Sequence, residues 1–276
     1  MKKFTFKACI KYIFVWLAVA ISLYPLLYII TIALKSNDSF ISDPNGLPKE
    51  IYWKNFSDAW VMGKIGAYAW NTIYMTAATI LIVVIISALT GFAIEKLCGK
   101  KDGKIFYNFF IIGIIMPLQV IMLPLFKILK QLQMINNPIG IIFIYVTLQL
   151  SFAIFVFTGF FKSIPDELIE SARIDGCTYN KTFWVIVFPL CKVVTATIAI
   201  FVGIEVWKDF TVPLVFVTNP SLKTLSAGLL YFNNEFNTNW TALAAAMLIQ
   251  TVPIIGLYIA MQERFVEGIT AGAVKG

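Results

Sequence analysis

Few residue combinations in this sequence could catalyse a reaction. The 276 residues include no histidine, which excludes a Ser-His-Asp triad and a histidine-ligated metal site. The four cysteines lie far apart and form no CxxC pair, so no disulfide framework is expected among Cys9, Cys98, Cys177 and Cys191. We therefore predict neither a catalytic residue nor a metal site in this chain.

One glycine-rich stretch has some of the features of a phosphate-binding loop. It runs from Gly99 to Ile105 and reads GKKDGKI. Its two glycines are one residue too close together, and Ile105 stands where such a loop needs a hydroxyl for magnesium. We interpret the stretch as a solvated basic turn, and we expect the chain itself to bind no nucleotide cofactor.

Segment 162–188 is the strongest candidate for a binding function, and it reads KSIPDELIESARIDGCTYNKTFWVIVF. Ser163, followed three residues later by Asp166, is typical of a helix start. The short helix would have one apolar face, formed by Leu168, Ile169 and Ala172. Gly176 is well placed to end this helix in a left-handed conformation.

Two interpretations of this amphipathic segment stay open on physical grounds. In the first, the apolar face packs into a groove of a partner protein, and Glu170 and Asp175 meet cationic or backbone groups at the rim. In the second, the helix lies on lipid headgroups at the membrane surface.

The composition places the supporting elements in a membrane. Hydrophobic residues make up 59% of the chain, charged residues only 13%, and mean hydropathy is +0.81. A membrane helix needs about 20 mostly apolar residues. We therefore predict an all-α integral membrane protein with six transmembrane helices, at about residues 12–34, 68–94, 105–127, 137–161, 189–217 and 241–262. The fifth is interrupted by Glu205, Lys208 and Asp209.

The distribution of basic residues predicts the orientation. With the amino terminus inside, 14 of the 22 Lys and Arg residues fall in inner segments, seven in outer loops and Lys208 within the fifth span. Both termini, the loop 162–188 and the tail 263–276 would then be cytoplasmic. The first apolar run is too long for a signal peptide, so we expect it to be retained as a helix. This topology accounts for the net charge of +7, and we expect no nucleic-acid partner.

The loop residues carry a family resemblance. Glu170-Ser171-Ala172, Asp175-Gly176-Cys177 and Ile186-Val187-Phe188-Pro189 have the spacing of the signature loop of bacterial ABC importer permeases, which reads Glu-Ala-Ala, Asp-Gly-Ala and Ile-x-Leu-Pro. Ser171, Cys177 and Phe188 depart from it by small or apolar exchanges. The sequence thus resembles a permease with the MetI-like fold of type I ABC importers.

Further motifs resemble the carbohydrate branch of that family. The tail Gly268–Gly276 is similar to that of the smaller permease subunit of maltose-type importers. The segments Trp53–Phe56, Asn71-Thr72 and Trp207–Phe210 also match this family's usual motifs. The resemblance therefore covers nearly the whole chain, as a single permease domain over residues 1–276.

The resemblance implies a sugar importer driven by other subunits. Two ATP-binding-cassette subunits would bind ATP and Mg²⁺ and move the loop, a second permease chain would complete the pathway, and an extracytoplasmic binding protein would deliver the sugar. Six loop residues would contact the ATPase: Glu170, Ser171, Ala172, Asp175, Gly176 and Cys177. Three tail residues, Gly272, Lys275 and Gly276, would reach between the ATPase subunits. The location would be a bacterial cytoplasmic membrane.

Polar residues in or beside the spans are candidates for a translocation path or outer gate. We single out Asn71, Gln119, Gln149, Trp207, Asp209 and Gln250. Hydrogen bonding between helices is an equally common role for such groups. Glu205 is spaced to pair with Lys208 or Asp209, and we expect Pro117, Pro124 and Pro253 to kink their helices.

Two alternatives differ in function. An ABC permease for a non-sugar solute would share the loop, and only the tail argues against it. A channel or secondary transporter would also be apolar, but it would transport without an ATPase and would not need the loop.

Overall fold

The computed structural model describes the backbone of residues 6–233 and 238–273, and side chains within residues 11–233 and 238–259. The chain divides into two compact units. One comprises Met1–Gly66 and Gly228–Ile254, and the other comprises Ala67–Ala227 and Ile255–Gly276. Each unit is described by itself below.

The first unit is built around helices at both ends of the chain. It contains α1 (Phe6–Ala33), α2 (Asn37–Ser42), α3 (Lys54–Met62), the start of α4 (Ile65–Phe92), the 3₁₀ turn η4 (Leu229–Phe232) and the first part of α14 (Trp240–Ala273).

Asn55 is the polar centre of this unit, and only 3% of it is exposed. Its amide group donates to the carbonyls of Ala33 at 2.8 Å and Lys35 at 2.6 Å, and its oxygen accepts from the Thr241 hydroxyl at 3.1 Å. One side chain thereby ties the end of α1 to the start of α14. The match of Trp53–Phe56 to a family motif thus has a structural reason.

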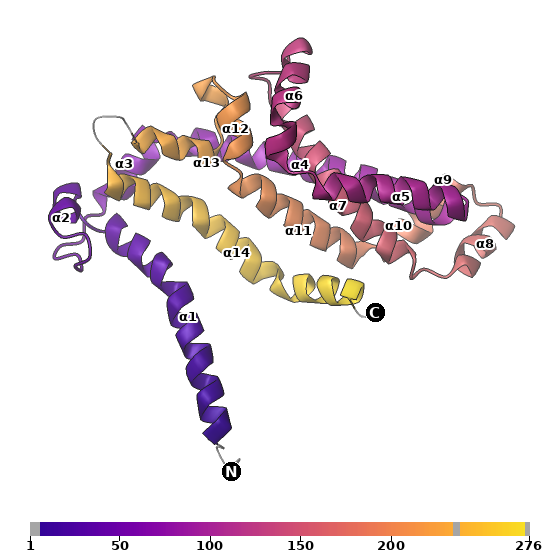
Figure 1. Cartoon of the computed structure of the whole chain (residues 1–276), viewed down its shortest axis with the longest axis horizontal. Coiled ribbons are helices and arrows are strands. Elements are labelled where there is room, and N and C mark those ends of the chain that lie inside the picture. Colours follow the sequence, from indigo (N-terminus) through magenta and orange to yellow (C-terminus); the bar gives the residue numbers. More distant parts are fainter. Residues whose placement is uncertain (1–5, 234–237, 274–276) are drawn as a thin grey trace. The chain divides into compact units, whose positions relative to one another are not determined.

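The second unit contains the remaining helices (Figure 1). After α4 come the π-helical segment η1 (Ala93–Leu97), α5 (Lys100–Ile115), α6 (Leu118–Gln131), α7 (Pro138–Phe161), α8 (Asp166–Ile174), α9 (Tyr179–Thr182), the π-helical segment η2 (Phe183–Val187), α10 (Phe188–Leu190), α11 (Lys192–Lys208), α12 (Thr211–Phe216), the 3₁₀ turn η3 (Pro220–Leu222) and α13 (Leu225–Gly228).

The core of the second unit centres on α7, which contacts α5, α11 and α12. Buried side chains of α4 join it, among them Met75, Val83 and Phe92. Gly91 allows α4 to approach α7 closely, because a Cβ at this position would lie 3.0 Å from Cβ of Phe157 and 3.1 Å from the Thr158 nitrogen.

Four helical stretches are long and apolar enough to cross a membrane: Lys11–Ala33, Ile65–Leu97, Pro138–Phe161 and Trp240–Ile259. Two bent helix pairs raise the number to six if each pair forms one span. The six predicted spans correspond to these four stretches and two pairs, but the third and fifth differ from the sequence-based expectation.

The third predicted span is not one continuous helix over residues 105–127. Helices α5 and α6 meet at an angle of 100°, and the break lies at Met116-Pro117 (Figure 1). Proline lacks an N–H and disfavours helical geometry in the residue before it, so Met116 is extended with ψ of 114°. The expected kink at Pro117 is therefore a full break, whereas α6 and α14 continue through Pro124 and Pro253.

The fifth predicted span, residues 189–217, also requires correction. The apolar helix begins earlier, and Tyr179–Leu190 joins α11 at an angle of 77°. At the other end α11 stops at Lys208, and Thr211–Phe216 forms the separate helix α12. Asp209 causes this separation, because its carboxylate accepts hydrogen bonds from the backbone N–H groups of Thr211 and Val212 and thereby starts a new helix.

Candidate functional site

Helix α8 and the turn after it form the centre of the candidate site. The N–H of Gly176 donates to the Arg173 carbonyl at 3.0 Å, and the N–H of Cys177 donates to the Ala172 carbonyl at 2.9 Å. This pair of bonds defines a Schellman turn, which needs a left-handed residue after the helix. Gly176 has φ of +78°, so the prediction of a left-handed stop is confirmed.

The start of α8 differs from the expectation for Ser163. The helix begins at Asp166. The Ser163 hydroxyl does not cap it, because it donates to the Phe160 carbonyl at 2.7 Å. The residue before the helix is Pro165, which provides no side-chain cap. Asp166 and Glu167 lie in the first turn, where negative charge stabilises the helix dipole.

The apolar face of α8 packs on the chain itself. Ile169 and Ala172 are buried, and Ile169 belongs to the core of the second unit. The expectation that this face enters a partner's groove is therefore wrong for these two residues. Ile169 belongs to the same buried cluster as Phe161 and Phe183, which removes its apolar surface from water. Leu168, the third residue of the predicted face, is 37% exposed.

The opposite face of α8 is open and carries both an acid and an apolar side chain. Glu170 is exposed, and Ile174, one turn further on, is 86% exposed. Within the part of the chain that the structure describes, Glu170 has no ion-pair partner. An exposed isoleucine beside an unpaired carboxylate suits a protein contact with an apolar centre and a cationic rim.

The other predicted loop residues support the turn. The Ser171 hydroxyl donates to the Glu167 carbonyl at 2.7 Å, and the N–H of Asp175 donates to the Ser171 carbonyl at 3.0 Å. Asp175 is exposed and Cys177 is half-buried. The structure thus brings the six predicted contact residues together in one helix and turn.

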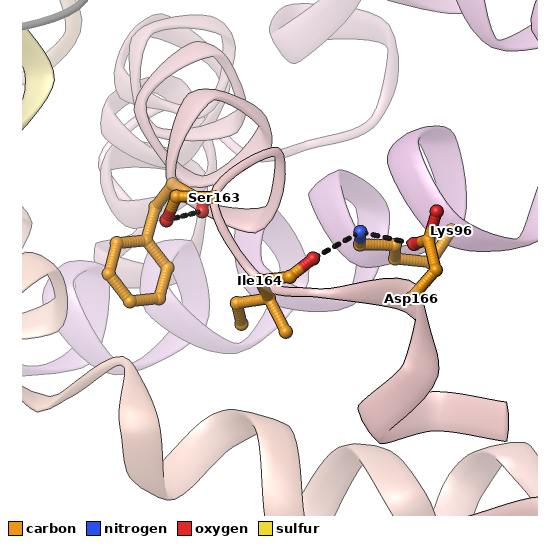
Figure 2. A network of polar contacts seen from close by, with 5 residues as sticks. Lys96, Ser163, Ile164 and Asp166 are labelled. Atoms are coloured by element: carbon orange, nitrogen blue, oxygen red, sulfur yellow. Dashed lines mark hydrogen bonds and ion pairs between the residues drawn. The ribbon is translucent and has the colours of Figure 1, made fainter. Parts of the chain in front are cut away.

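Lys96 holds the beginning of the loop (Figure 2). Its Nζ donates to the Ile164 carbonyl at 2.7 Å and to Asp166 Oδ1 at 2.6 Å. The Lys96 side chain is only 6% exposed, whereas that of Asp166 is 76% exposed. Because Lys96 lies in η1, this contact joins α8 to the end of α4.

The second half of the loop is fixed by Arg173 and an aromatic cluster. The Arg173 guanidinium donates to the Tyr179 hydroxyl at 2.6 Å and lies 4.7 Å from the centre of the same ring. Phe183 is buried and packs against Phe92 of α4, with ring centres 5.3 Å apart. The loop is therefore supported by side chains from its own chain at both ends.

A pocket of about 510 Å³ lies beside this loop, between η1, α5 and the end of α7. Three lysines, Lys100, Lys104 and Lys162, and the carboxylate of Glu95 line it. In the described part of the chain no three Cys, Asp or Glu residues are arranged to hold a metal ion.

Asn71 and Thr72, near the start of α4, hold a distant segment. The Asn71 amide group donates to the carbonyls of Ser221 at 2.7 Å and Lys223 at 3.0 Å. The Thr72 hydroxyl accepts from the N–H of Leu225 at 3.0 Å. Both donors of the Asn71 amide are thus used in fixing segment 221–225.

The polar residues after α11 also have structural partners. Besides starting α12, Asp209 accepts a hydrogen bond from the Tyr145 hydroxyl of α7 at 3.0 Å. The Trp207 carbonyl accepts from Ser226 at 3.1 Å. The predicted local pairing of Glu205 is confirmed, because Lys208 lies 2.7 Å from its carboxylate.

The remaining candidates are dispersed. Gln119 is exposed at the start of α6, and Gln149 is half-buried on α7. Gln250 is half-buried on α14, in the first unit. In the tail, Gly272 lies on α14, whereas Lys275 and Gly276 lie outside the described residues.

Sequence reasoning missed Lys96 and Asn55. Lys96 looked like one of several inner lysines, although only Glu95 separates it from an apolar span of more than 25 residues. Asn55 was noticed only as part of a motif. Lys96 lies beside a long apolar run, whereas Asn55 lies in the polar stretch KNFSD and has no such signal. Lys96 reaches Ile164, 68 positions away, and Asn55 reaches Lys35 and Thr241, 20 and 186 positions away.

Comparison with known proteins places the chain in a family. The family model described as "Binding-protein-dependent transport system inner membrane component" matches residues 87–270. That range includes α8, the turn at Gly176 and Lys96.

Several curated proteins are similar over most of their length. The chain is 32% identical to the probable ABC transporter permease protein YurM of Bacillus subtilis, over 96% of this chain and 88% of YurM. It is 33% identical to the melibiose/raffinose/stachyose import permease protein MelC of the same organism, over 91% of each protein. It is 28% identical to the probable starch degradation products transport system permease protein AmyC of Thermoanaerobacterium thermosulfurigenes, over 96% of this chain and 97% of AmyC.

A solved structure has the same fold. A chain of a bacterial ABC transporter involved in importing the acidic polysaccharide alginate superposes with a TM-score of 0.81 at 20% identity, over 96% of this chain and 98% of that one. The predicted permease fold is thereby confirmed. This chain belongs to the family of binding-protein-dependent transport system inner membrane components, and it is a multi-pass membrane permease subunit rather than an enzyme.

Proposed function

We propose that this chain is one permease subunit of an ATP-driven sugar importer, and that α8 is where a separate ATPase drives it. The observation that carries the proposal is the open face of α8, on a helix whose other face is buried. Ile174 is 86% exposed, and Glu170 forms no ion pair with any residue that the structure describes. A surface of this kind is fixed in position and available for a partner.

The sugar class is supported by the relatives and by the tail. MelC is named for melibiose, raffinose and stachyose import, and AmyC for starch degradation products. The tail motif from Gly268 to Gly276 points to the same branch of the family. An amino acid or another non-sugar solute is the alternative that uptake assays would reveal.

The energy comes from partner subunits in this proposal. The stretch Gly99–Ile105 lacks the spacing and the hydroxyl of a phosphate loop, so ATP and Mg²⁺ would be bound by two ATPase subunits. An ATPase groove would receive Ile174, and a basic side chain at its rim would pair with Glu170. Gly272, Lys275 and Gly276 would add a second contact between the ATPase subunits.

The proposed topology places α8 and both termini in the bacterial cytoplasm, following the bias of Lys and Arg. A second permease chain would complete the translocation pathway, and an extracytoplasmic binding protein would deliver the sugar. Closure of the ATPases would displace α8 and switch the paired permeases between inward-open and outward-open states. Asn71, Gln119, Gln149, Trp207, Asp209 and Gln250 remain candidates for the path or its outer gate.

The test is co-purification of the ATPase with permease variants. Glu170→Lys and Ile174→Asp should each reduce the recovered ATPase and sugar uptake by about tenfold, because a repelling charge or a buried carboxylate costs more than 1.4 kcal/mol in an interface. Asp102→Lys is the matched control, since Asp102 is an exposed acid on α5 outside the loop. Undiminished ATPase recovery in both loop variants would refute the docking role of α8.

Uptake of labelled solutes by a strain that lacks this gene tests the substrate class. Restoring the gene should restore uptake of a mono- or oligosaccharide. Restored uptake of amino acids or phosphate alone would refute the sugar assignment and leave the ATPase contact in place.

A further inference from the structure

We propose that Lys96 is a positioning residue that ties the ATPase-contacting loop to helix α4, and that α4 with η1 carries the loop's displacement to segment 221–225 at its other end. This inference rests on the proposed function, because it needs a partner that moves α8.

The Lys96 contact is built to hold the entry of the loop. One ammonium group joins two points, the Ile164 carbonyl at 2.7 Å and the Asp166 carboxylate at 2.6 Å, and these flank the residue before α8 (Figure 2). The lysine side chain is 6% exposed. A buried ammonium needs such partners, since without them its desolvation is unfavourable. Lys96 is therefore directed at the loop and is not a solvated surface charge.

The loop has other attachments, and they differ in kind. It is covalently continuous with α7 at Lys162 and with η2 at Phe183. Among the described residues, Lys96 of η1 provides a polar link between the loop and the end of α4. The ring contact between Phe92 and Phe183 provides an apolar one. Removal of Lys96 should therefore leave α8 folded while loosening it from α4.

Helix α4 and η1 form one continuous stretch, Ile65–Leu97. Its buried side chains, including Met75, Val83, Ala88 and Phe92, pack in the core. The π-helical turn at its end closes with the N–H of Cys98 on the Ala93 carbonyl at 2.9 Å. The α-helical part, Ile65–Phe92, contains no proline and is packed in the core, so it resists bending and can transmit a displacement along its length. The bond that closes η1 and the contact between Phe92 and Phe183 join the loop to this part.

The far end of α4 is also held by side chains of the helix. Asn71 and Thr72 make three hydrogen bonds to the backbone of Ser221, Lys223 and Leu225. Asn71 and Lys96 are 25 positions apart, which corresponds to about 38 Å at the rise of an α-helix. The helix thus connects two loops at opposite ends of the second unit, each through side chains of α4 or η1.

The experiment uses the whole transporter in proteoliposomes and measures three quantities: ATPase recovered with the permease, ATP hydrolysis, and sugar taken up per ATP hydrolysed. Lys96→Met should keep the recovered ATPase within about twofold and lower uptake per ATP by about fivefold or more, the size of a typical coupling energy between sites. Lys101→Met is the matched control, an exposed lysine five positions away that should change none of the three.

A second pair of variants tests the same contact from the side of Asp166, so that the result does not depend on whether Lys96→Met folds. Asp166 is 76% exposed, so Asp166→Asn should fold normally and lower uptake per ATP by about twofold, as expected for loss of one partly exposed charge. Asp166→Glu restores the charge and should restore the ratio.

A label at the far end tests transmission itself. Ser221 is exposed, so Ser221→Cys in a background without the four native cysteines can be labelled with a maleimide. ATP should change the labelling rate when Lys96 is present, and Lys96→Met should abolish that change.

The possible results separate the inference from the proposed function. Unchanged uptake per ATP in both Lys96→Met and Asp166→Asn would overturn the inference, and so would a parallel loss of ATPase recovery, which would mean that Lys96 only supports the loop's fold. Failure of the unsubstituted permease to recover any ATPase would instead refute the proposed function.

Discussion

The two ends of helix α4 are attached by different chemistry. At its carboxyl end, Lys96 of η1 makes an ion pair whose acidic partner, Asp166, is 76% exposed. At its amino end, Asn71 and Thr72 use neutral hydrogen bonds, and these residues are 8% and 1% exposed. Water can replace Lys96 at the exposed carboxylate at little cost, while the buried ammonium keeps the Ile164 carbonyl as a partner. Asn71 and Thr72 are themselves buried and together hold three backbone groups, so their loss costs more. The ion pair with Asp166 is therefore the weaker of the two attachments, and the hydrogen bonds at the amino end are the stronger.

The largest loss of stability should follow from Asn71→Leu. This change leaves the carbonyls of Ser221 and Lys223 without their donor, which costs about 2–3 kcal/mol. The thermal unfolding midpoint in detergent should fall by about 5 °C or more. Gln149→Leu, at a half-buried amide on α7, should change it much less. Equal midpoints for the two variants would mean that the amino end is no stronger than an ordinary site.

Thr72→Val should have the next largest effect. The valine keeps the shape of threonine but leaves the N–H of Leu225 without an acceptor, at a cost of about 1–2 kcal/mol. The midpoint should fall by about half as much as in Asn71→Leu. Thr147→Val is a suitable control, because the exposed Thr147 hydroxyl only donates to the Phe143 carbonyl one turn earlier. A larger loss in the control would contradict the importance of segment 221–225.

Gly176→Ala should destabilise the loop by about 1 kcal/mol, because an alanine at a φ of +78° is strained. No atom lies within 4 Å of the position that the new Cβ would take, so crowding adds nothing. Gly159→Ala on α7 meets equally open space but has helical backbone, and it should be neutral or slightly stabilising. Limited proteolysis of the loop can compare the two, and similar cleavage rates would refute the backbone argument.

The smallest effect on stability is expected for Asp166→Asn. Because the carboxylate is 76% exposed, its loss should cost about 0.5 kcal/mol or less, and 1 M salt should have a similarly small effect on the unsubstituted protein. Differential scanning fluorimetry at low and high salt measures both. A loss as large as that of Asn71→Leu would remove the contrast between the two ends of α4.

Local sequence patterns were sufficient for several features. Apolar runs between charged residues predicted six spans, because a helix that crosses lipid must be long and apolar. Four of them correspond to long apolar helices and two to bent helix pairs. Gly176 was correctly predicted to end α8 in a left-handed conformation. That prediction needed only the position of the glycine shortly after the apolar residues of the helix. The local pair Glu205–Lys208 also follows from helical spacing alone.

Other features depend on partners far along the chain. The apolar face of α8 was correctly identified, but its partner was not, since Ile169 packs in the chain's own core. Pro117 predicted a kink, whereas the two helices meet at 100° and pack on different partners, α5 on α7 and Phe126 of α6 on Phe216 of α12. Asn71 was a candidate for the translocation path, and its position alone could not reveal that its donors serve Ser221 and Lys223.

By itself, the sequence determined the class of protein, the positions of the long apolar stretches and the helix and turn of the loop, because these follow from hydrophobicity and from interactions within a few residues. Only the tertiary structure decided which face of α8 is free, where two spans bend and what Lys96 and Asn71 hold. The contacts of Lys96 and Asn71 join residues 68 to 152 positions apart, and such contacts form only when the helices pack.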